Sequence, residues 1–312
     1  MMWDGFRRNV VDIDGVALSV RTAGEGAPLL LLHGQLQNAN AWHLVAPALA
    51  QDFRVIVPDL RGAGESGCPV APDCAGPSDP AAWSDRRMAG DMLRLLGALG
   101  MRRAAVMAHD GGAQVALRMA LDAPERVECL AVVEGVPNGA LWAGSRWPGD
   151  PCGFDRLLLA QPGSLPERLI GADPDAFVDM VLAAGTAGGS VFAFHPVALA
   201  SYRQQMRDPA RLAALCARHR AGILVDRRRD LADAAQGRLV TMPLHLVCAS
   251  GTGRRFEGGL PRAWAPWCAR PGISRVESGH FVPEENPAAL LKAVRAFLLG
   301  RSPVGSEIRH AA

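Results

Sequence analysis

The chain has 312 residues, of which 49% are hydrophobic and 21% are charged, and its formal net charge is +2. A chain of this length can form a single large domain with one inserted segment. The near-neutral charge and the absence of a basic stripe predict no nucleic-acid or membrane partner. The seven cysteines are odd in number and lack metal-ligand spacing, so we expect reduced thiols, no metal and no disulfide framework. No apolar stretch is long enough to cross a bilayer and no signal peptide is recognisable, which predicts a cytoplasmic protein.

Alternating apolar segments predict the elements in chain order. Residues 10–22 alternate around Asp14-Gly15, which indicates a β-hairpin. From 28 to 134, strand-like runs alternate with helical stretches, a pattern typical of βαβ units and a largely parallel sheet. The strand-like runs are then replaced by helical segments interrupted by Pro and Gly, and strand-like runs return at 243–249 and 273–277.

These changes between strand-like and helical patterns predict the domain organisation. We expect a core that begins with residues 1–136, a helical cap over 137–239, a second core segment over 240–300, and a flexible tail over 301–312. The last core segment is expected to carry an amphipathic helix over 287–298.

The segment 108–112, Ala-His-Asp-Gly-Gly, lies where a predicted strand turns into a predicted helix. A small-x-nucleophile-x-small sequence at such a junction is typical of a nucleophile elbow, in which small neighbours allow a strained backbone. The side chain in the nucleophile position is Asp110. A carboxylate there suits attack on a saturated carbon, because the product is an ester that water can later cleave. The alternative interpretation of Asp110 is a helix-capping aspartate.

Two further candidates follow strands later in the chain. Glu134 comes directly after the apolar run 127–133, and His280 comes shortly after the run 273–277. Nucleophile, acid and histidine follow one another in the chain order of an α/β-hydrolase, and open α/β sheets place their chemistry at strand ends. The sequence therefore predicts a catalytic set of Asp110, Glu134 and His280.

The sequence also predicts an oxyanion hole, the pair of N–H groups that stabilises a negative oxygen formed during the reaction. The buried-strand run 29–32 ends in His33-Gly34-Gln35, the place from which this fold draws one oxyanion-hole amide. The residue after the nucleophile supplies the other amide. We therefore expect the backbone N–H groups of Gln35 and Gly111 to form the oxyanion hole.

The chain resembles the fluoroacetate and haloacetate dehalogenases, relatives of the epoxide hydrolases and haloalkane dehalogenases. The matching segments are 28–34, Trp42-His43, 45–47, 157–174, His195-Pro196, 201–203, 207–209, Cys216 and 278–280. Because many of these lie in the predicted cap, the match extends beyond a shared core. The resemblance implies an α/β-hydrolase fold, with a mostly parallel sheet flanked by helices and an inserted helical cap. It also implies a small-molecule substrate and no cofactor, and the dimers common in that family make a homodimer the assembly to test.

The substrate-binding positions depart from the family. Those dehalogenases carry arginines directly after the nucleophile and three residues further on, where this chain has Gly111 and Gln114. They hold the departing halide with a His-Trp pair and a Tyr in the cap, and by register these positions are Asp155, Arg156 and His219. The resemblance therefore implies a retained catalytic set in a rebuilt pocket.

The leading hypothesis is a hydrolase of this branch that forms an ester on Asp110 with a small organic substrate other than fluoroacetate. Three alternatives remain open at this point. One is an epoxide hydrolase in which His219 is the acid. The second is a lyase, cyclase or isomerase that uses Asp110 as a base, and the third is a ligand-binding protein without turnover.

Overall fold

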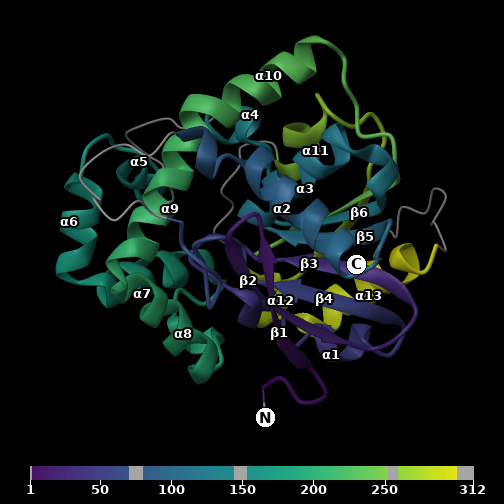
Figure 1. The fold of residues 1–312 in the computed structure, drawn as a ribbon, viewed down its shortest axis with the longest axis horizontal. Coiled ribbons are helices and arrows are strands. Elements are labelled where there is room, and N and C mark those ends of the chain that lie inside the picture. The colour runs from purple at the N-terminus through teal and green to yellow at the C-terminus, as the bar shows by residue number, and fades with distance from the viewer. Residues whose placement is uncertain (1, 70–79, 144–152, 252–258, 301–312) are drawn as a thin grey trace.

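The computed structural model describes residues 2–69, 80–143, 153–251 and 259–300, and it contains one eight-stranded sheet (Figure 1). In chain order the strands are β1 (Arg7–Ile13), β2 (Val16–Ala23), β3 (Ala27–Leu32), β4 (Phe53–Pro58), β5 (Ala104–His109), β6 (Val127–Val133), β7 (Leu244–Ala249) and β8 (Gly272–Val276). Their order across the sheet is β1-β2-β4-β3-β5-β6-β7-β8. β2 runs antiparallel to both of its neighbours and the remaining pairs are parallel, so the predicted fold class is confirmed.

Helices cover both faces of this sheet. Leu29 and Leu31 belong to one apolar cluster and Leu30 and Leu32 to another, because successive side chains of β3 point to opposite faces. All four are fully buried, which explains the continuous apolar run in the sequence. One face is covered by α2 (Asp85–Ala98), α3 (Gly111–Asp122) and α11 (Gly259–Trp264), and the other by α1 (Ala46–Leu49) and α13 (Pro287–Leu298).

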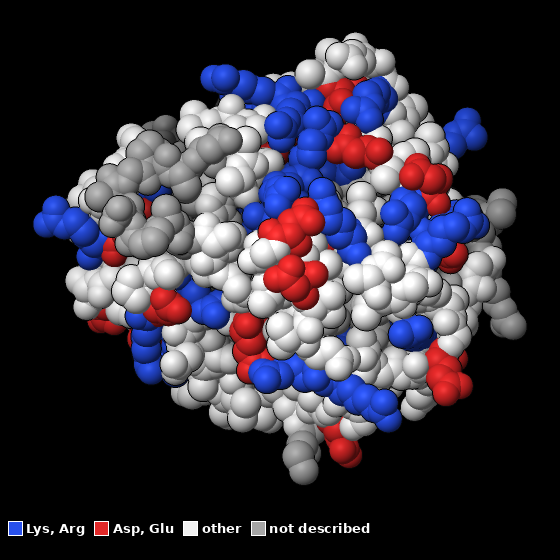
Figure 2. Space-filling view, in the orientation of Figure 1, with Lys and Arg blue, Asp and Glu red and all other residues white. Residues whose placement is uncertain are grey.

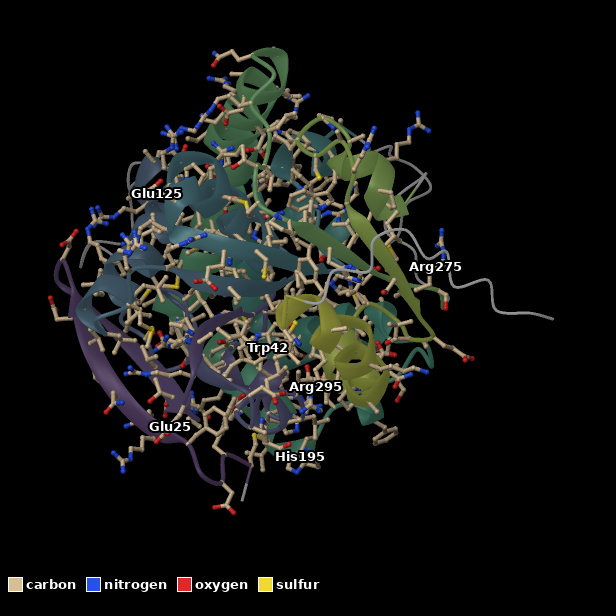
Figure 3. The ribbon with its side chains drawn as sticks, turned by 90° about the vertical axis from the view of Figure 1, so that its right-hand side faces the viewer. Glu25, Trp42, Glu125, His195, Arg275 and Arg295 are labelled. Carbon is tan, nitrogen blue, oxygen red and sulfur yellow. The ribbon has the colours of Figure 1, made fainter. Side chains whose placement is uncertain are left out.

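Trp42 lies on the face of the sheet that α1 and α13 cover. Seen from the side, Trp42 lies in the interior near α13, whereas Glu25, Glu125 and Arg275 lie at the margins (Figure 3). Trp42 is fully buried in the cluster that also contains residues of α13. The connecting 3₁₀ turns are η1 (Ala39–Trp42), η2 (Pro80–Trp83), η3 (Pro124–Arg126) and η4 (Val191–Ala193), and α12 (Val282–Glu285) precedes α13.

Between β6 and β7 the described residues are helical. They form α4 (Asn138–Leu141), α5 (Phe154–Leu159), α6 (Leu165–Ala172), α7 (Pro174–Gly185), α8 (Pro196–Arg207), α9 (Pro209–Ala221), the π-helical turn η5 (Gly222–Asp226) and α10 (Arg227–Ala235). In Figure 1, α5 to α9 lie to one side of the sheet, and α10 extends across α4. Several of these helices begin with a proline, which has no N–H group to leave unpaired. The capping side chains of Asp173 and Asp208 accept hydrogen bonds from backbone N–H groups in the first turn.

Several predicted elements are confirmed. The hairpin forms around Asp14 and Gly15, both with positive φ, and the helix predicted over 287–298 has the same bounds as α13. The five described cysteines are free, while Cys74, Cys152 and the predicted tail lie outside the described residues. No described helix has the length and apolar character that crossing a membrane requires. Basic and acidic side chains are interleaved on the face seen in Figure 2, with the densest basic group near α10.

Candidate active site

Asp110 occupies the sharp turn between β5 and α3. Its backbone has φ 46° and ψ −120°, a conformation that costs energy in a residue other than glycine. The Asp110 N–H donates to the carbonyl of Val133 at 3.1 Å, which fixes the turn against β6. A Cβ on Gly112 would lie 2.6 Å from the carbonyl oxygen of Leu32, and one on Gly135 would lie 2.7 Å from that of Asp110. The neighbouring glycines therefore let α3 start this close to the sheet.

His280 lies between two carboxylates. Its Nε2 is 3.6 Å from Asp110 Oδ1 and its Nδ1 is 3.7 Å from Glu134 Oε2. Both distances exceed a hydrogen bond, as is common in catalytic groups without bound substrate. The imidazole is almost fully buried, and the His280 N–H donates to the carbonyl of Gly185 at 2.7 Å. The structure thus brings the three residues of the predicted catalytic set together.

Glu134 is held by the strand next to its own. The Glu134 N–H donates to the carbonyl of Val247 at 3.1 Å, and its Oε1 accepts a hydrogen bond from the Ala249 N–H at 2.7 Å. Its φ is +47°, so Glu134 is also in the left-handed region. Leu36, Asp110 and Glu134 are three of the four non-glycine residues with positive φ in the described chain, and strain of this kind clusters at functional sites.

The backbone amide of Gln35 points at the Asp110 carboxylate. Its N–H donates to Asp110 Oδ2 at 2.9 Å, which is the direction an oxyanion-hole donor needs. Gly111 is the first residue of α3, where backbone N–H groups have no partner within the helix. The Gln35 donor therefore lies at the Asp110 carboxylate, and the Gly111 N–H belongs to the residue that follows Asp110.

A small pocket opens at this carboxylate. It is lined by Gln35, Leu36, Asp110, Asp155, Leu159, Val181, Leu182, His280 and Phe281. We call it the reaction pocket. Of the substrate positions predicted from the sequence, Asp155 lines the reaction pocket. Gln114, Arg156 and His219 are buried side chains that are not among its lining residues.

The environment of His219 limits its chemistry. Burial lowers the pKa of His219 to about 4, although the charges of Asp155 and Asp110 oppose that shift. Its Nδ1 lies 2.9 Å from the carbonyl oxygen of Leu215 and must donate, so in the neutral ring Nε2 carries no proton. Nε2 has no hydrogen-bond partner among the described residues. His219 is therefore a neutral acceptor near neutral pH, which disfavours the alternative in which it protonates an epoxide oxygen.

Sequence reasoning missed a buried polar chain behind the histidine. Tyr202 Oη donates to Glu284 Oε1 at 3.1 Å, and Gln37 Nε2 donates to Glu284 Oε2 at 2.6 Å. Gln37 Oε1 lies 3.0 Å from His109 Nδ1, and His109 Nε2 donates to the carbonyl of His280 at 2.9 Å. Burial raises the pKa of Glu284 to about 8, against the hydrogen bonds from Tyr202 and Gln37. No local pattern in the sequence distinguishes Glu284 from the exposed acids that often start helices.

His33 and Arg61, two other polar residues near the site, support loops. His33 Nδ1 donates to the carbonyl of Gly34, its Nε2 accepts from the Leu60 N–H, and burial lowers its pKa to about 4. Arg61 binds both oxygens of Asp91, at 2.6 Å and 2.7 Å. These contacts fix the loops after β3 and β4, which carry Gln35 and the wall of a neighbouring pocket.

Comparison with known proteins agrees with this architecture. Residues 27–175 match the model of the alpha/beta hydrolase fold family. The chain is 36% identical over 297 residues to a fluoroacetate dehalogenase from a Burkholderia species, with 95% of each chain covered. It is 32% identical over 289 residues to a soluble epoxide hydrolase from Corynebacterium strain C12, covering 91% of this chain and 94% of that one.

Solved structures extend the similarity to three dimensions. A Pseudomonas aeruginosa protein provisionally named an epoxide hydrolase has 38% sequence identity and a TM-score of 0.86, over 96% of this chain and 97% of that one. Because these matches cover 91% to 96% of this chain, they include the helical segment between β6 and β7. The chain therefore belongs to the dehalogenase and epoxide hydrolase branch of the α/β-hydrolase fold family.

Proposed function

We propose that this protein hydrolyses a small organic electrophile through an ester on Asp110. The observation that carries the proposal is the orientation of the Asp110 carboxylate, with Oδ2 held by the Gln35 amide and Oδ1 3.6 Å from His280 Nε2. Oδ2 is therefore the oxygen that the oxyanion hole serves, and Oδ1, the oxygen on the side of His280, is the one that attacks.

The first step forms the ester. A lone pair of Asp110 Oδ1 forms a bond to the electrophilic carbon, and the bond from that carbon to halide or to the epoxide oxygen breaks with its electron pair. A halide leaves as the anion. An epoxide oxygen instead stays on the product and has to gain a proton.

The second step consumes water. His280 Nε2 takes a proton from a water molecule as that water adds to the ester carbonyl, and the negative oxygen is stabilised by the N–H groups of Gln35 and Gly111. The tetrahedral intermediate releases the alcohol, which receives the proton from His280, and leaves Asp110 as a carboxylic acid. Asp110 becomes a carboxylate again by losing this proton, to solvent after halide release or to restore the acid that protonated an epoxide oxygen. Glu134 stabilises the charged imidazole and keeps its Nε2 directed at Asp110.

Asp155 favours epoxide opening over halide release. The reaction pocket is lined by two carboxylic acids, Asp110 and Asp155, and by no arginine or lysine among the described residues. A carboxyl group at this position gives a departing halide no cation to bind, whereas it places a proton-transferring group where an opening epoxide oxygen needs one. His219 cannot replace it in that role, because its Nε2 is an acceptor.

The test is the capture of the ester in a His280→Ala variant. The variant is incubated with haloacids, haloalkanes, epoxides and lactones, and the Asp110 peptide is examined by mass spectrometry. We expect a stable adduct whose mass is that of the whole epoxide, or of the haloalkane without its halide. The matched control, His280→Ala combined with Asp110→Asn, should carry none.

The same experiment separates the alternatives. Turnover by the wild-type protein without any adduct in the variant would favour Asp110 as a base, as in a lyase or isomerase. Substrate binding with neither adduct nor product would favour a binding protein. Either result would contradict the proposed aspartyl-ester mechanism.

A further inference from the structure

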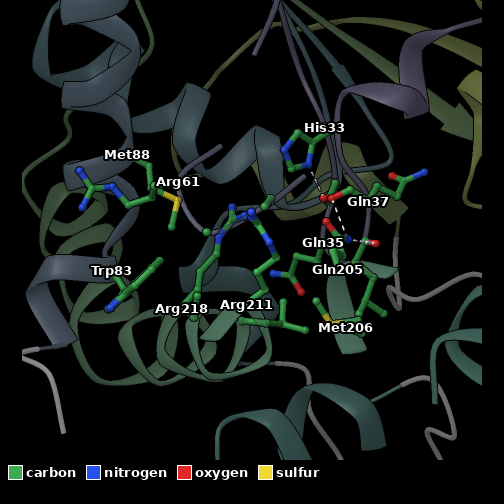
Figure 4. A pocket seen from close by; sticks show the side chains of 16 residues that line it. His33, Gln35, Gln37, Arg61, Trp83, Met88, Gln205, Met206, Arg211 and Arg218 are labelled. Carbon is green, nitrogen blue, oxygen red and sulfur yellow. Dashed lines mark hydrogen bonds between the residues drawn. The ribbon is translucent and has the colours of Figure 1, made fainter. Parts of the chain in front are cut away.

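A second pocket adjoins the reaction pocket and has the opposite charge. It shares Gln35 and Leu36 with the reaction pocket. Its described lining contains three arginines, Arg61, Arg211 and Arg218, and no carboxylate, as Figure 4 shows. The reaction pocket differs, because its described lining contains two carboxylates, Asp110 and Asp155, and no arginine or lysine. We call the second pocket the basic pocket.

The three arginines differ in what they have left to donate. Arg61 uses Nε and Nη2 on Asp91 and Nη1 on the carbonyl of Ala82, so all of its nitrogens are occupied. Arg211 donates from Nη1 to the carbonyl of Ser66. The described hydrogen bond of Arg218 uses Nη2, which donates to the carbonyl of Gly111 at 2.7 Å. No described residue accepts a hydrogen bond from Arg218 Nη1, so this nitrogen can donate to a bound ligand.

Arg218 is a buried cation that forms a long ion pair with Asp85. It is 8% exposed, and its nearest carboxylate, that of Asp85, is 3.6 Å away. The Asp85 carboxylate also accepts a hydrogen bond from Asn138 Nδ2 at 2.6 Å. A buried guanidinium with free donors is costly, and an anion in the basic pocket would offset that cost.

Gly111 makes room for two donors to converge beside Asp110. A Cβ on Gly111 would lie 3.2 Å from Arg218 Nη2 and 3.2 Å from Gln35 Nε2, and 2.7 Å from Gln35 Cγ. The Gln35 side chain has no hydrogen-bond partner among the described residues, while its backbone N–H is bound to Asp110. Gln35 thus presents its backbone to the reaction pocket and its side-chain amide to the region of Arg218.

We propose that the basic pocket binds the carboxylate of a substrate whose electrophilic carbon lies in the reaction pocket. Arg218 Nη1 and Gln35 Nε2 donate to the two carboxylate oxygens, and Arg211 adds positive charge at the same wall. This proposal rests on the proposed function and names its substrate class. The substrate is a carboxylic acid in which several bonds separate the acid from the reacting carbon, because an acid next to that carbon would face Asp110 and Asp155.

The test compares acids with uncharged isosteres. The kcat/KM values of wild-type protein are measured for ω-bromoalkanoates and terminal epoxy-acids of increasing chain length, and for the matched bromoalkanes and alkyl epoxides. We expect the acid-to-isostere ratio to be low for the shortest acid and to rise with chain length to a maximum of about tenfold or more, the value of one charged hydrogen bond. A ratio that stays at or below one at every length would overturn the proposal.

The variant that tests the site is Arg218→Met. It should bring the acid-to-isostere ratio to about one, and because the ratio compares two substrates of the same variant, any general loss of turnover from the missing Gly111 contact cancels. Arg218→Lys should restore part of the preference. Arg220→Met is the matched control on the same helix, because Arg220 binds Glu167 and the carbonyl of Gly163 on the cap surface. If Arg218→Met does not fold because Asp85 is left unpaired, the double variant with Asp85→Asn and the single variant Gln35→Leu make the same test.

Binding of an unreactive acid separates this proposal from the proposed function. Calorimetry with hexanoate uses the Asp110→Asn variant, with and without Arg218→Met. Binding that depends on Arg218 supports the basic pocket even if no ester forms on Asp110. Ester formation with uncharged substrates, together with no hexanoate binding, would overturn the basic pocket and leave the proposed function intact.

Discussion

The N–H of His280 donates to the carbonyl of Gly185 at 2.7 Å, so the last residue of α7 holds the loop that carries the candidate base. Gly279, next to His280, lies close to the same carbonyl: a Cβ there would be 2.7 Å from it and 2.7 Å from Glu285 Oε1. The position of the imidazole is therefore set jointly by β8, α7 and α12.

This contact predicts the effect of Gly279→Ala. The added methyl group would push the loop away from α7 and move His280 from Asp110 and Glu134, so we expect kcat to fall more than tenfold, since small misplacements of catalytic groups are costly. Steady-state kinetics and thermal unfolding check this. The control is Gly97→Ala in α2, where a Cβ would meet nothing within 4 Å. Unchanged kcat in Gly279→Ala would contradict the positioning role of the loop.

Glu134→Gln should separate the two chemical steps. The amide keeps an oxygen for the Ala249 N–H but loses the charge that stabilises the His280 imidazolium. We expect ester formation on Asp110 at a nearly normal rate and ester hydrolysis slowed by about 10³-fold or more, by analogy with loss of the triad acid elsewhere. Rapid-quench mass spectrometry measures both rates. Equal slowing of the two steps would show that Glu134 acts on the structure of the whole site.

Asp155→Asn tests the choice between epoxide and halide. Removal of the acid should lower epoxide turnover at least tenfold, since an amide cannot transfer a proton to the opening oxygen. Haloalkane turnover should stay the same or rise, because halide release needs no proton and the amide N–H can donate a hydrogen bond to the departing anion. Parallel measurement of kcat for an epoxide and a bromoalkane of the same length checks this. A parallel loss of both activities would contradict a specific role of Asp155 as acid.

Much of this architecture could be predicted from local patterns. The continuous apolar run of β3, the hairpin at Asp14 and the small residues around Asp110 are each encoded within a few neighbouring residues. The missed contacts join distant segments: Gln37 and Glu284 are 247 residues apart in the chain, and Arg218 and Gly111 are 107 apart. A single sequence gives no signal for such pairs, because burial of an acid or an arginine is decided by the packing of elements that fold separately.

Glu284 should make the stability of the fold depend on pH. Its pKa in the folded protein is about 8, above the ordinary value of 4.5, because burial disfavours the carboxylate. Stability from this group is therefore fully present below the ordinary pKa and is lost as the pH rises through about 8. Glu284→Gln retains polar partners for Tyr202 and Gln37 without a titrating group, so its stability should change less with pH than that of the wild-type protein.

Urea unfolding of both proteins at pH about 5 and about 8 measures this difference. Burial also raises the pKa of Asp226 to about 8 and that of Asp230 to about 7, so the wild-type protein should keep part of its pH dependence when Glu284 is replaced. The informative quantity is thus the pH-dependent difference between wild type and Glu284→Gln, with exposed Glu125→Gln as the control. A Glu284→Gln protein that loses as much stability as wild type between these pH values would show that Glu284 is ionised in the fold, and the chain from Tyr202 to His109 would then carry a buried negative charge.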